Sequence, residues 1–135
     1  MNPINLVAIG NDSGSAFGKT FAEYSTAFSD RNHIALCAAF ASNAKVIIRD
    51  RRIDQTLELT PAAFFERLYK EIETASFQIE NATAQFNDGY LFVDGTWIDQ
   101  QGAPLLRAAD LFTAFSDGQI AALDVVWTNE KINAK

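Results

Sequence analysis

Hydrophobic residues recur with helical spacing near the start of the chain. Phe17, Phe21, Tyr24 and Phe28 follow one another at intervals of four, three and four residues. Such intervals place all these side chains on one face of a helix, with the polar residues on the opposite face. The pattern predicts an amphipathic helix over residues 16–29 that buries its aromatic face.

Two further helices and a short strand are predicted before residue 75. Asn32 is a suitable N-terminal cap for a helix over residues 33–41. Residues 45–49 are rich in β-branched side chains and indicate a short strand. Thr60 and Pro61 are typical of the cap and the first position of a third helix. This third helix is expected to bury an apolar stripe made of Phe64, Phe65, Leu68 and Ile72.

From residue 75 onward the periodicity changes to that of strands. Phe77, Ile79, Asn81 and Thr83 alternate with Gln78 and Glu80, and turn signals at 87–89, 101–102 and 117–118 divide the rest into apolar runs. Gly95 interrupts one of these runs and suggests a bulge or bend. The chain is therefore predicted to form three helices, with a short strand before the third, and then four long antiparallel strands. Helices and strands segregated in this way indicate an α+β fold.

Composition restricts the size and the partners of the protein. The chain has 135 residues, of which 48% are hydrophobic and 11 are phenylalanines, enough to build the core of one domain. With 11 basic and 17 acidic residues, its net charge is −6. We expect no nucleic-acid partner, because phosphate binding needs clustered Lys and Arg. The densest basic run, Arg49-Asp-Arg-Arg52, is interrupted by an acidic residue.

The sequence offers little support for a membrane segment or for a metal site. The apolar run Ile4–Ile9 is too short to span a membrane and lacks the basic start of a secretion signal. We therefore expect a cytoplasmic protein that does not enter a membrane. Cys37 and His33 are the single cysteine and the single histidine. They allow no disulfide within the chain and no cluster of His and Cys ligands, and we expect neither a metal nor a cofactor.

One carboxylate stands out against this pattern. Asp110 lies in the middle of the apolar segment 105–115, which otherwise reads as a buried strand. A carboxylate in such a strand is costly unless it is paired, protonated or facing a pocket. Asp124 also interrupts a strand, but alternation places it opposite Leu123 and Val125, on the outer face of the sheet. Asp110 is therefore the best sequence indication of a functional site.

Two local motifs resemble those of the nuclear transport factor 2-like superfamily. Residues 40–46, Phe-Ala-Ser-Asn-Ala-Lys-Val, are similar to that family's Tyr-Ala-Asp-Asp-Ala-x-Val. Residues 110–120, followed by Trp127, resemble its pattern of Asp, Phe, Gly and Ile leading to an aromatic residue. The superfamily includes the SnoaL-like polyketide cyclases, ketosteroid isomerases, limonene epoxide hydrolases and scytalone dehydratases.

The resemblance implies a fold and an oligomeric state. It covers residues 16–128, which leaves residues 1–15 as an N-terminal extension and 129–135 as a C-terminal tail. The implied domain is a cystatin-like cone, in which a strongly bent mixed or antiparallel sheet wraps around three helices and leaves a deep, largely apolar pocket. It also implies a homodimer, because many relatives pair through the outer face of the sheet.

The ketosteroid isomerases of this superfamily imply roles for particular residues. Their Tyr and protonated Asp, which together hold an enolate oxygen, fall on Tyr24 and Asp110 when residues are counted without gaps. Their catalytic base falls on Ile48, and Asp50, two residues further along, is the candidate base. The residues that would contact the substrate as pocket walls are Phe112, Trp127, Ile48 and Val125.

Two classes of function remain open at this point. The first is an isomerase, cyclase or hydrolase acting on a hydrophobic carbonyl-containing small molecule, with Tyr24 and Asp110 as oxyanion donors. The second is a non-catalytic module that binds a hydrophobic ligand or only dimerises, because Ile48 occupies the position of the base. The Asp-Arg-Asp site of limonene-type epoxide hydrolases is not expected, since Arg107 should face the opposite side of its strand from Asp110.

Overall fold

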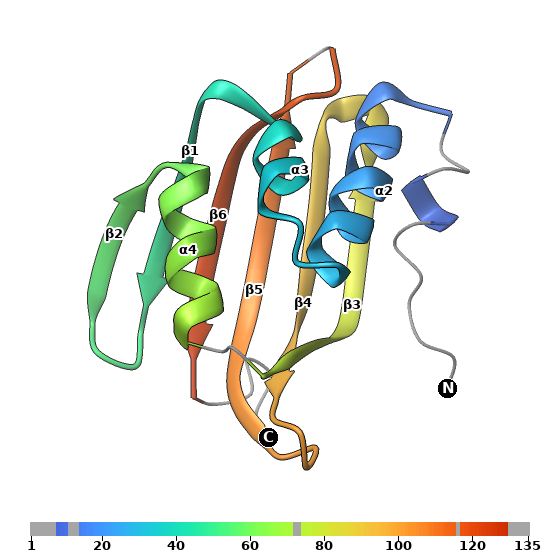
Figure 1. Cartoon of the computed structure of the whole chain (residues 1–135). Coiled ribbons are helices and arrows are strands. Elements are labelled where there is room, and N and C mark those ends of the chain that lie inside the picture. The colour runs from blue at the N-terminus through green and yellow to red at the C-terminus, as the bar shows by residue number, and fades with distance from the viewer. Residues whose placement is uncertain (1–7, 11–13, 72–73, 116, 130–135) are drawn as a thin grey trace.

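Helices and a six-stranded sheet make up the fold of the protein, seen in a computed structural model (Figure 1). The structure describes residues 8–10, 14–71, 74–115 and 117–129. The predicted N-terminal extension and C-terminal tail lie largely outside these residues. In chain order the elements are α2 (Ala16–Ser29), α3 (His33–Ala38), β1 (Phe40–Asp50), β2 (Gln55–Leu59), α4 (Pro61–Glu71), β3 (Ser76–Gln85), the short 3₁₀-helix η1 (Phe86–Asp88), β4 (Tyr90–Ile98), β5 (Pro104–Ala114) and β6 (Ile120–Thr128).

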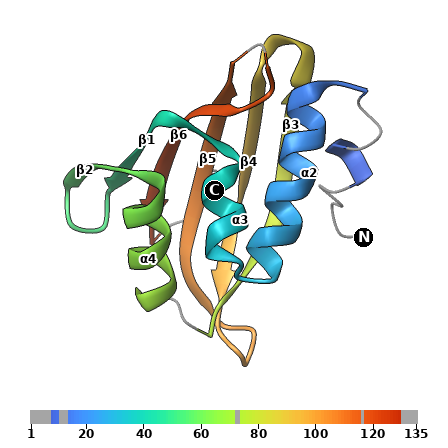
Figure 2. The same ribbon diagram turned by 45° about the horizontal axis from the view of Figure 1, so that its top comes forward.

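The sheet has the strand order β2-β1-β6-β5-β4-β3. The pair β1 and β6 is parallel, and the remaining pairs are antiparallel. The predicted α+β class and the four consecutive antiparallel strands β3 to β6 are confirmed. Helices α2, α3 and α4 lie against one face of the sheet, which curves around them (Figures 1 and 2). We call this helix-covered side the inner face; among the described elements, no helix covers the outer face.

Local sequence signals decide where the long helices begin. Ser15 caps α2 by accepting a hydrogen bond from the Gly18 amide, at a distance of 2.9 Å. Thr60 caps α4 in the same way through the Ala63 amide, at 3.2 Å. Each cap satisfies a backbone donor that has no partner within the helix. The predicted range of α2 and the predicted start of α4 at Pro61 are both confirmed.

The second helix is shorter than its pattern predicts, and the strand after it is longer. Helix α3 begins after its predicted cap Asn32 but ends at Ala38, so the predicted range 33–41 was wrong at its C-terminus. Phe40 pairs with Ile120 of β6, and the Ile120 amide donates to the carbonyl of Ala39 at 3.0 Å. Pairing with a strand distant in sequence overrides the local helical pattern, because it satisfies the same backbone groups within the sheet.

The edge strand β2 was not predicted from the sequence. Its burial alternates only between exposed and half-buried positions, so its hydrophobic pattern is weak. It is held by five antiparallel residue pairs with β1, from Val46↔Leu59 to Asp50↔Gln55. Pairing with β1, rather than its own sequence pattern, accounts for this element.

The predicted irregularity at Gly95 is present, but the extra residue lies on the neighbouring strand. Ile79 pairs with Gly95 and Asn81 with Asp94, so Glu80 is the additional residue of β3. A Cβ atom on Gly95 would lie 2.2 Å from the carbonyl oxygen of Gln78. Glycine is therefore required because the two backbones approach closely at the bulge.

Candidate functional site

The strand register places Asp110 on the inner face of the sheet. In β5, the side chains of Ala108 and Phe112, two residues to either side of Asp110, are buried. Across the sheet, Asp110 pairs with Val93 of β4 and Val125 of β6, both buried. The candidate carboxyl therefore lies within the apolar layer between sheet and helices, as the side-chain alternation of strands requires.

The Asp110 carboxyl is a polar group placed in this apolar layer. The residue as a whole is half-buried, but within the described part of the chain its buried Oδ1 has no hydrogen-bond partner. Burial raises the pKa of Asp110 from 3.8 to about 7, because the charged form loses its hydration. Near neutral pH a large fraction of this carboxyl is therefore protonated, and in that form it can donate a hydrogen bond.

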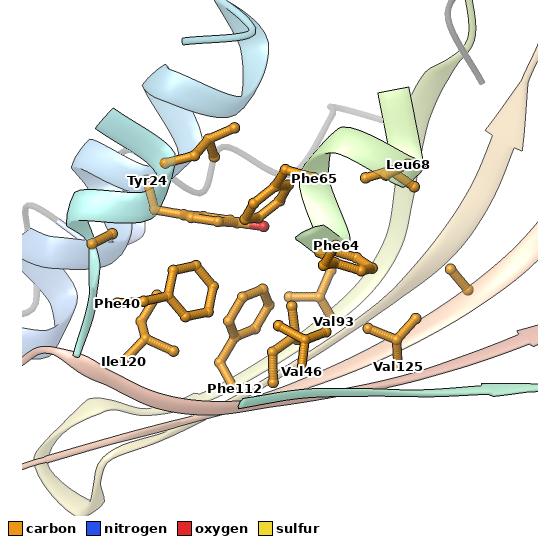
Figure 3. Close-up of a cluster of buried hydrophobic side chains, with 14 of the residues drawn as sticks. Tyr24, Phe40, Val46, Phe64, Phe65, Leu68, Val93, Phe112, Ile120 and Val125 are labelled. Atoms are coloured by element: carbon orange, nitrogen blue, oxygen red, sulfur yellow. The ribbon is translucent and has the colours of Figure 1, made fainter. Parts of the chain in front are cut away.

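Tyr24 reaches the same region from α2. Its side chain is 6% exposed and meets Phe112 of β5 edge-on, with ring centroids 5.3 Å apart. Figure 3 shows the Tyr24 ring extending toward Phe65 of α4, above residues of the sheet. The pKa of Tyr24 is raised first by burial and then by the charge of Asp110. The two predicted oxyanion donors are thus brought close to each other by elements from opposite ends of the chain.

The predicted wall residues all lie in the hydrophobic core. Ile48 and Val125 are each 1% exposed, and Phe112 and Trp127 are each 2% exposed. Ile48 pairs with Val125 across β1 and β6, so these side chains continue the inner-face row that contains Asp110. Their contact with a ligand is still a prediction, since their burial also fits a purely structural role.

A depression on the surface lies elsewhere. It has a volume of about 310 Å³ and is lined by residues of α2, of α3 and of the turn between them: Ala22, Glu23, Thr26, Ala27, Asp30, Asn32 and Ala35. It includes none of the predicted site residues. The site predicted from sequence therefore concerns the inner face and not this depression between the two helices.

Asp50, the candidate base, is already engaged in an ion pair. It lies on the inner face and is 4% exposed. Arg52 donates from Nε to Oδ1 at 2.8 Å and from Nη2 to Oδ2 at 2.7 Å, and its backbone amide donates to Oδ1 at 3.1 Å. The pKa of Asp50 is lowered, mainly by the side-chain hydrogen bonds from Arg52 and also by the charges of Arg52 and Arg67. A carboxylate stabilised in this way is a weak proton acceptor.

Arg107 lies on the outer face, as strand alternation predicts. It donates to Glu80 and, at 2.9 Å, to the hydroxyl of Thr96. Asp94 lies 3.9 Å from the same guanidinium group. Asp124 is also on the outer face, where it pairs with Arg49 at 3.3 Å. Neither residue can take part in a site that contains Asp110.

Sequence reasoning missed the position of Arg52 near the inner face. The guanidinium of Arg52 lies over the ring of Trp127, 5.4 Å from its centroid. The basic run that contains Arg52 was visible in the sequence, but nothing in it indicated that the side chain folds back onto the inner face. Within the described residues, no group of three or more His, Cys, Asp or Glu side chains is arranged as a metal site.

Comparison with known proteins supports the fold and little beyond it. No protein-family model matches the sequence, and no curated protein matches it. Across the described residues, every helix is too short or too polar to cross a lipid bilayer.

Solved structures, in contrast, resemble the chain over most of its length. One is a cystatin-like protein of unknown function from Methylobium petroleophilum, with a TM-score of 0.67 and 14% identity over 89% of this chain and 80% of that one. A candidate SnoaL-like polyketide cyclase from Shewanella putrefaciens has a TM-score of 0.64 and 13% identity over 95% and 90% of the two chains. A nuclear transport factor 2-like protein of unknown function from Burkholderia pseudomallei has a TM-score of 0.60 and 18% identity over 82% and 89%. The chain therefore has the cystatin-like fold of the nuclear transport factor 2-like proteins.

Proposed function

We propose that the protein binds an apolar small molecule carrying a carbonyl or phenolic oxygen, held by Asp110 and Tyr24 at the inner face. The observation that carries this proposal is the buried Oδ1 of Asp110, which has no hydrogen-bond partner among the described residues. A buried polar atom without a partner costs about 1–3 kcal/mol. A ligand oxygen would remove that cost.

The chemistry of the surrounding residues supports an apolar ligand with one polar end. A protonated carboxyl and a phenol are both hydrogen-bond donors, and together they can point at one oxygen. Ile48, Phe112 and Val125 supply apolar surface on the same face. An oxygen held by two donors away from water is bound much more strongly than one in solvent. The arrangement therefore favours a hydrophobic carbonyl compound or phenol over a polar metabolite.

Catalysis is a second candidate function, favoured by the pKa of Asp110. A carboxyl whose pKa is about 7 can both donate and accept a proton near neutral pH. Ile48 occupies the position where related isomerases carry a base, and Asp50 is held by Arg52. An isomerase, cyclase or hydrolase built on this site would therefore use Asp110 itself for proton transfer, with Tyr24 as the oxyanion donor.

Binding is tested by fluorescence titration with equilenin, a rigid apolar phenol, at pH 6. Asp110→Leu should weaken binding at least about tenfold, and Tyr24→Phe should also weaken it, because each removes a buried hydrogen bond. Asp110→Asn keeps a donor and should retain most of the affinity. Asp124→Asn, a carboxylate change on the outer face of the sheet, is the matched control and should bind like the unmodified protein. Equal affinity for all four variants would contradict the proposed site.

Catalysis is tested separately by hydrogen exchange. The protein is mixed with an apolar cyclic ketone in D₂O, and deuterium incorporation next to the carbonyl is followed by NMR. Exchange above background that disappears in Asp110→Asn would support proton transfer by Asp110. Binding without such exchange would leave a ligand-binding module as the function.

A further inference from the structure

The Oδ1 atom of Asp110 is buried out of contact with solvent. The helices over the inner face pack closely there: the rings of Tyr24 in α2 and Phe65 in α4 have centroids 6.1 Å apart, and Phe65 is fully buried (Figure 3). Protein interiors are close-packed, so a ligand oxygen can reach this atom only if part of the helical cover moves away from the sheet. The proposed function therefore requires an entrance that opens.

Arg31 fastens the turn after α2 to the end of α4. Its guanidinium lies over the Tyr69 ring, 4.5 Å from the centroid, and donates from Nη2 to the carbonyl of Ala75 at 2.9 Å. The Tyr69 hydroxyl donates in turn to the carbonyl of Phe28 in α2, at 3.2 Å. We call the side chains of Arg31 and Tyr69 the latch. It joins α2, α4 and the residue before β3, which are far apart in the chain.

The backbone of Arg31 points to a role for its side chain. Its φ of 52° lies in the left-handed region, which within the described residues is shared by one other non-glycine residue, Asp54. Helices commonly end with glycine in this conformation, because a Cβ atom is strained there. The contacts of the guanidinium offset this strain, and Arg31 is exposed. Contacts at the surface break and re-form more readily than buried ones.

The latch lies at one end of a route that leads to Asp110. Phe28, which accepts the hydrogen bond from the latch, contacts Trp97 of β4, with ring centroids 5.8 Å apart. The next inner-face pair of β4 and β5 is Gly95 and Ala108, and the pair after it contains Asp110. At about 3.3 Å per residue, Asp110 lies about 13 Å along the strands from Trp97. Glycine and alanine fill little of the layer, so this route has room for an apolar ligand once the helices separate.

We propose that the latch closes the entrance to the ligand site, and that its opening limits the rate at which a ligand reaches Asp110. This inference rests on the proposed function, which makes Asp110 the end of the ligand's route. When the latch contacts break, the turn after α2 separates from the end of α4, and the layer opens from that end. Binding that requires such a change has a reduced association rate.

Access to position 110 can be measured without any ligand. In an Asp110→Cys variant that also carries Cys37→Ser, the new thiol reacts with DTNB only when the layer opens. Arg31→Gly removes the guanidinium and accepts the φ of 52° without strain. It should raise the labelling rate about tenfold, as expected for the loss of one cation–π contact and one hydrogen bond. Tyr69→Phe removes only the hydroxyl and should raise the rate less.

A second reporter separates opening at the latch from unfolding of the whole protein. Ile120 is fully buried and pairs with Phe40 at the start of β1. A thiol introduced by Ile120→Cys, again with Cys37→Ser, should react more slowly than the thiol at position 110, with and without Arg31→Gly. Asp54→Gly is the matched control, because it relieves the same backbone strain in the turn between β1 and β2, and it should leave the rate at position 110 unchanged.

Two labelling results would overturn the latch. Equal rates at positions 110 and 120 would mean that Asp110 is reached only by unfolding of the whole protein. A faster rate at position 110 that does not respond to Arg31→Gly would mean that the layer opens elsewhere.

Stopped-flow fluorescence with equilenin connects the latch to the ligand. The latch is closed before and after binding, so Arg31→Gly should raise the association and dissociation rates together and leave the affinity nearly unchanged. If labelling responds as expected but equilenin does not bind, the latch controls access to the inner face and the proposed function is wrong. If equilenin binding depends on Asp110 but neither labelling nor the binding rates respond to Arg31→Gly, the latch is wrong and the proposed function stands.

Discussion

Asp110 and Asp50 lie on the same face of the sheet, yet their pKa values shift in opposite directions. Asp110 has only apolar strand neighbours, and burial raises its pKa to about 7. Asp50 accepts three hydrogen bonds from Arg52, and its pKa is lowered. Desolvation penalises the charged form of the first, whereas hydrogen bonding stabilises the charged form of the second. Asp110 is therefore suited to donating a proton, whereas Asp50 is suited to staying charged.

The raised pKa of Asp110 should make folding stability depend on pH. The unfolded chain releases this proton near pH 3.8 and the folded protein near pH 7, so the folded state binds more protons between these values. The contribution of Asp110 to the free energy of unfolding is complete below about pH 4 and is lost as the pH rises to about 7. Three units of pKa correspond to about 4 kcal/mol.

This dependence is measured by urea unfolding of the unmodified protein and of Asp110→Asn between pH 4 and 8. The asparagine side chain does not titrate, so the difference between the two proteins isolates Asp110. The unmodified protein should lose stability relative to the variant as the pH rises. If the difference in unfolding free energy between the two proteins stayed constant from pH 4 to 8, Asp110 would not have the raised pKa that its burial requires.

At the scale of elements, close backbone approach decides the shape of the sheet. The bulge at Glu80 turns both Glu80 and Asn81 outward, where Glu80 binds Arg107 and Asn81 donates to Asp94 at 3.1 Å. The inner-face alternation then resumes at Ala82, which pairs with Val93. Because of the bulge, both ends of β3 contribute side chains to the core. The middle of the strand carries polar side chains on the outer face.

Gly95→Ala should destabilise the protein by about 2–3 kcal/mol, as overpacking in a rigid site does. The new Cβ would lie 2.2 Å from the Gln78 carbonyl oxygen, a backbone atom in the bulge that cannot rotate away. Urea unfolding measures the loss. Gly102→Ala is the control, because there a Cβ meets nothing within 4 Å and only the φ of +84° is strained. A loss at Gly95 no greater than that at Gly102 would contradict the close approach.

At the scale of the whole molecule, the two faces of the sheet differ. The inner face is covered by α2, α3 and α4, as Figures 1 and 2 show. On the outer face, the half-buried side chains of Phe92 and Leu111 are paired across β4 and β5, and Val126 lies on β6. Apolar side chains on a sheet face without helices are typical of an interaction surface. We therefore propose that the protein forms a homodimer through the outer face, as the family resemblance implies.

Sedimentation equilibrium tests this expectation. The unmodified protein should have twice the mass of one chain, and Leu111→Glu should shift it to the monomer, because a charge would be buried in the contact. Ala62→Glu, on the exposed surface of α4, is the control and should remain dimeric. A monomeric unmodified protein at tens of micromolar would rule out a stable dimer.

Much of the architecture is determined by local sequence. The aromatic periodicity and Ser15 define α2, Thr60 and Pro61 start α4, and the turn at Gly89 joins β3 to β4, because caps, turns and periodicity act between residues close in the chain. The inner-face position of Asp110 also follows from simple strand alternation. The place of Tyr24 opposite Asp110 came only from the family resemblance, since no local rule connects residues so distant in sequence.

Only the tertiary structure decided the features that depend on distant partners. The end of α3 and the existence of β2 depend on pairing with β6 and β1, which satisfies backbone groups that the local pattern leaves open. The engagement of Asp50 by Arg52 depends on a side chain folding back over Trp127. The state of Asp110 depends on which neighbours surround it. The sequence by itself placed a costly carboxyl in a strand, and the packed layer around that strand determined its pKa.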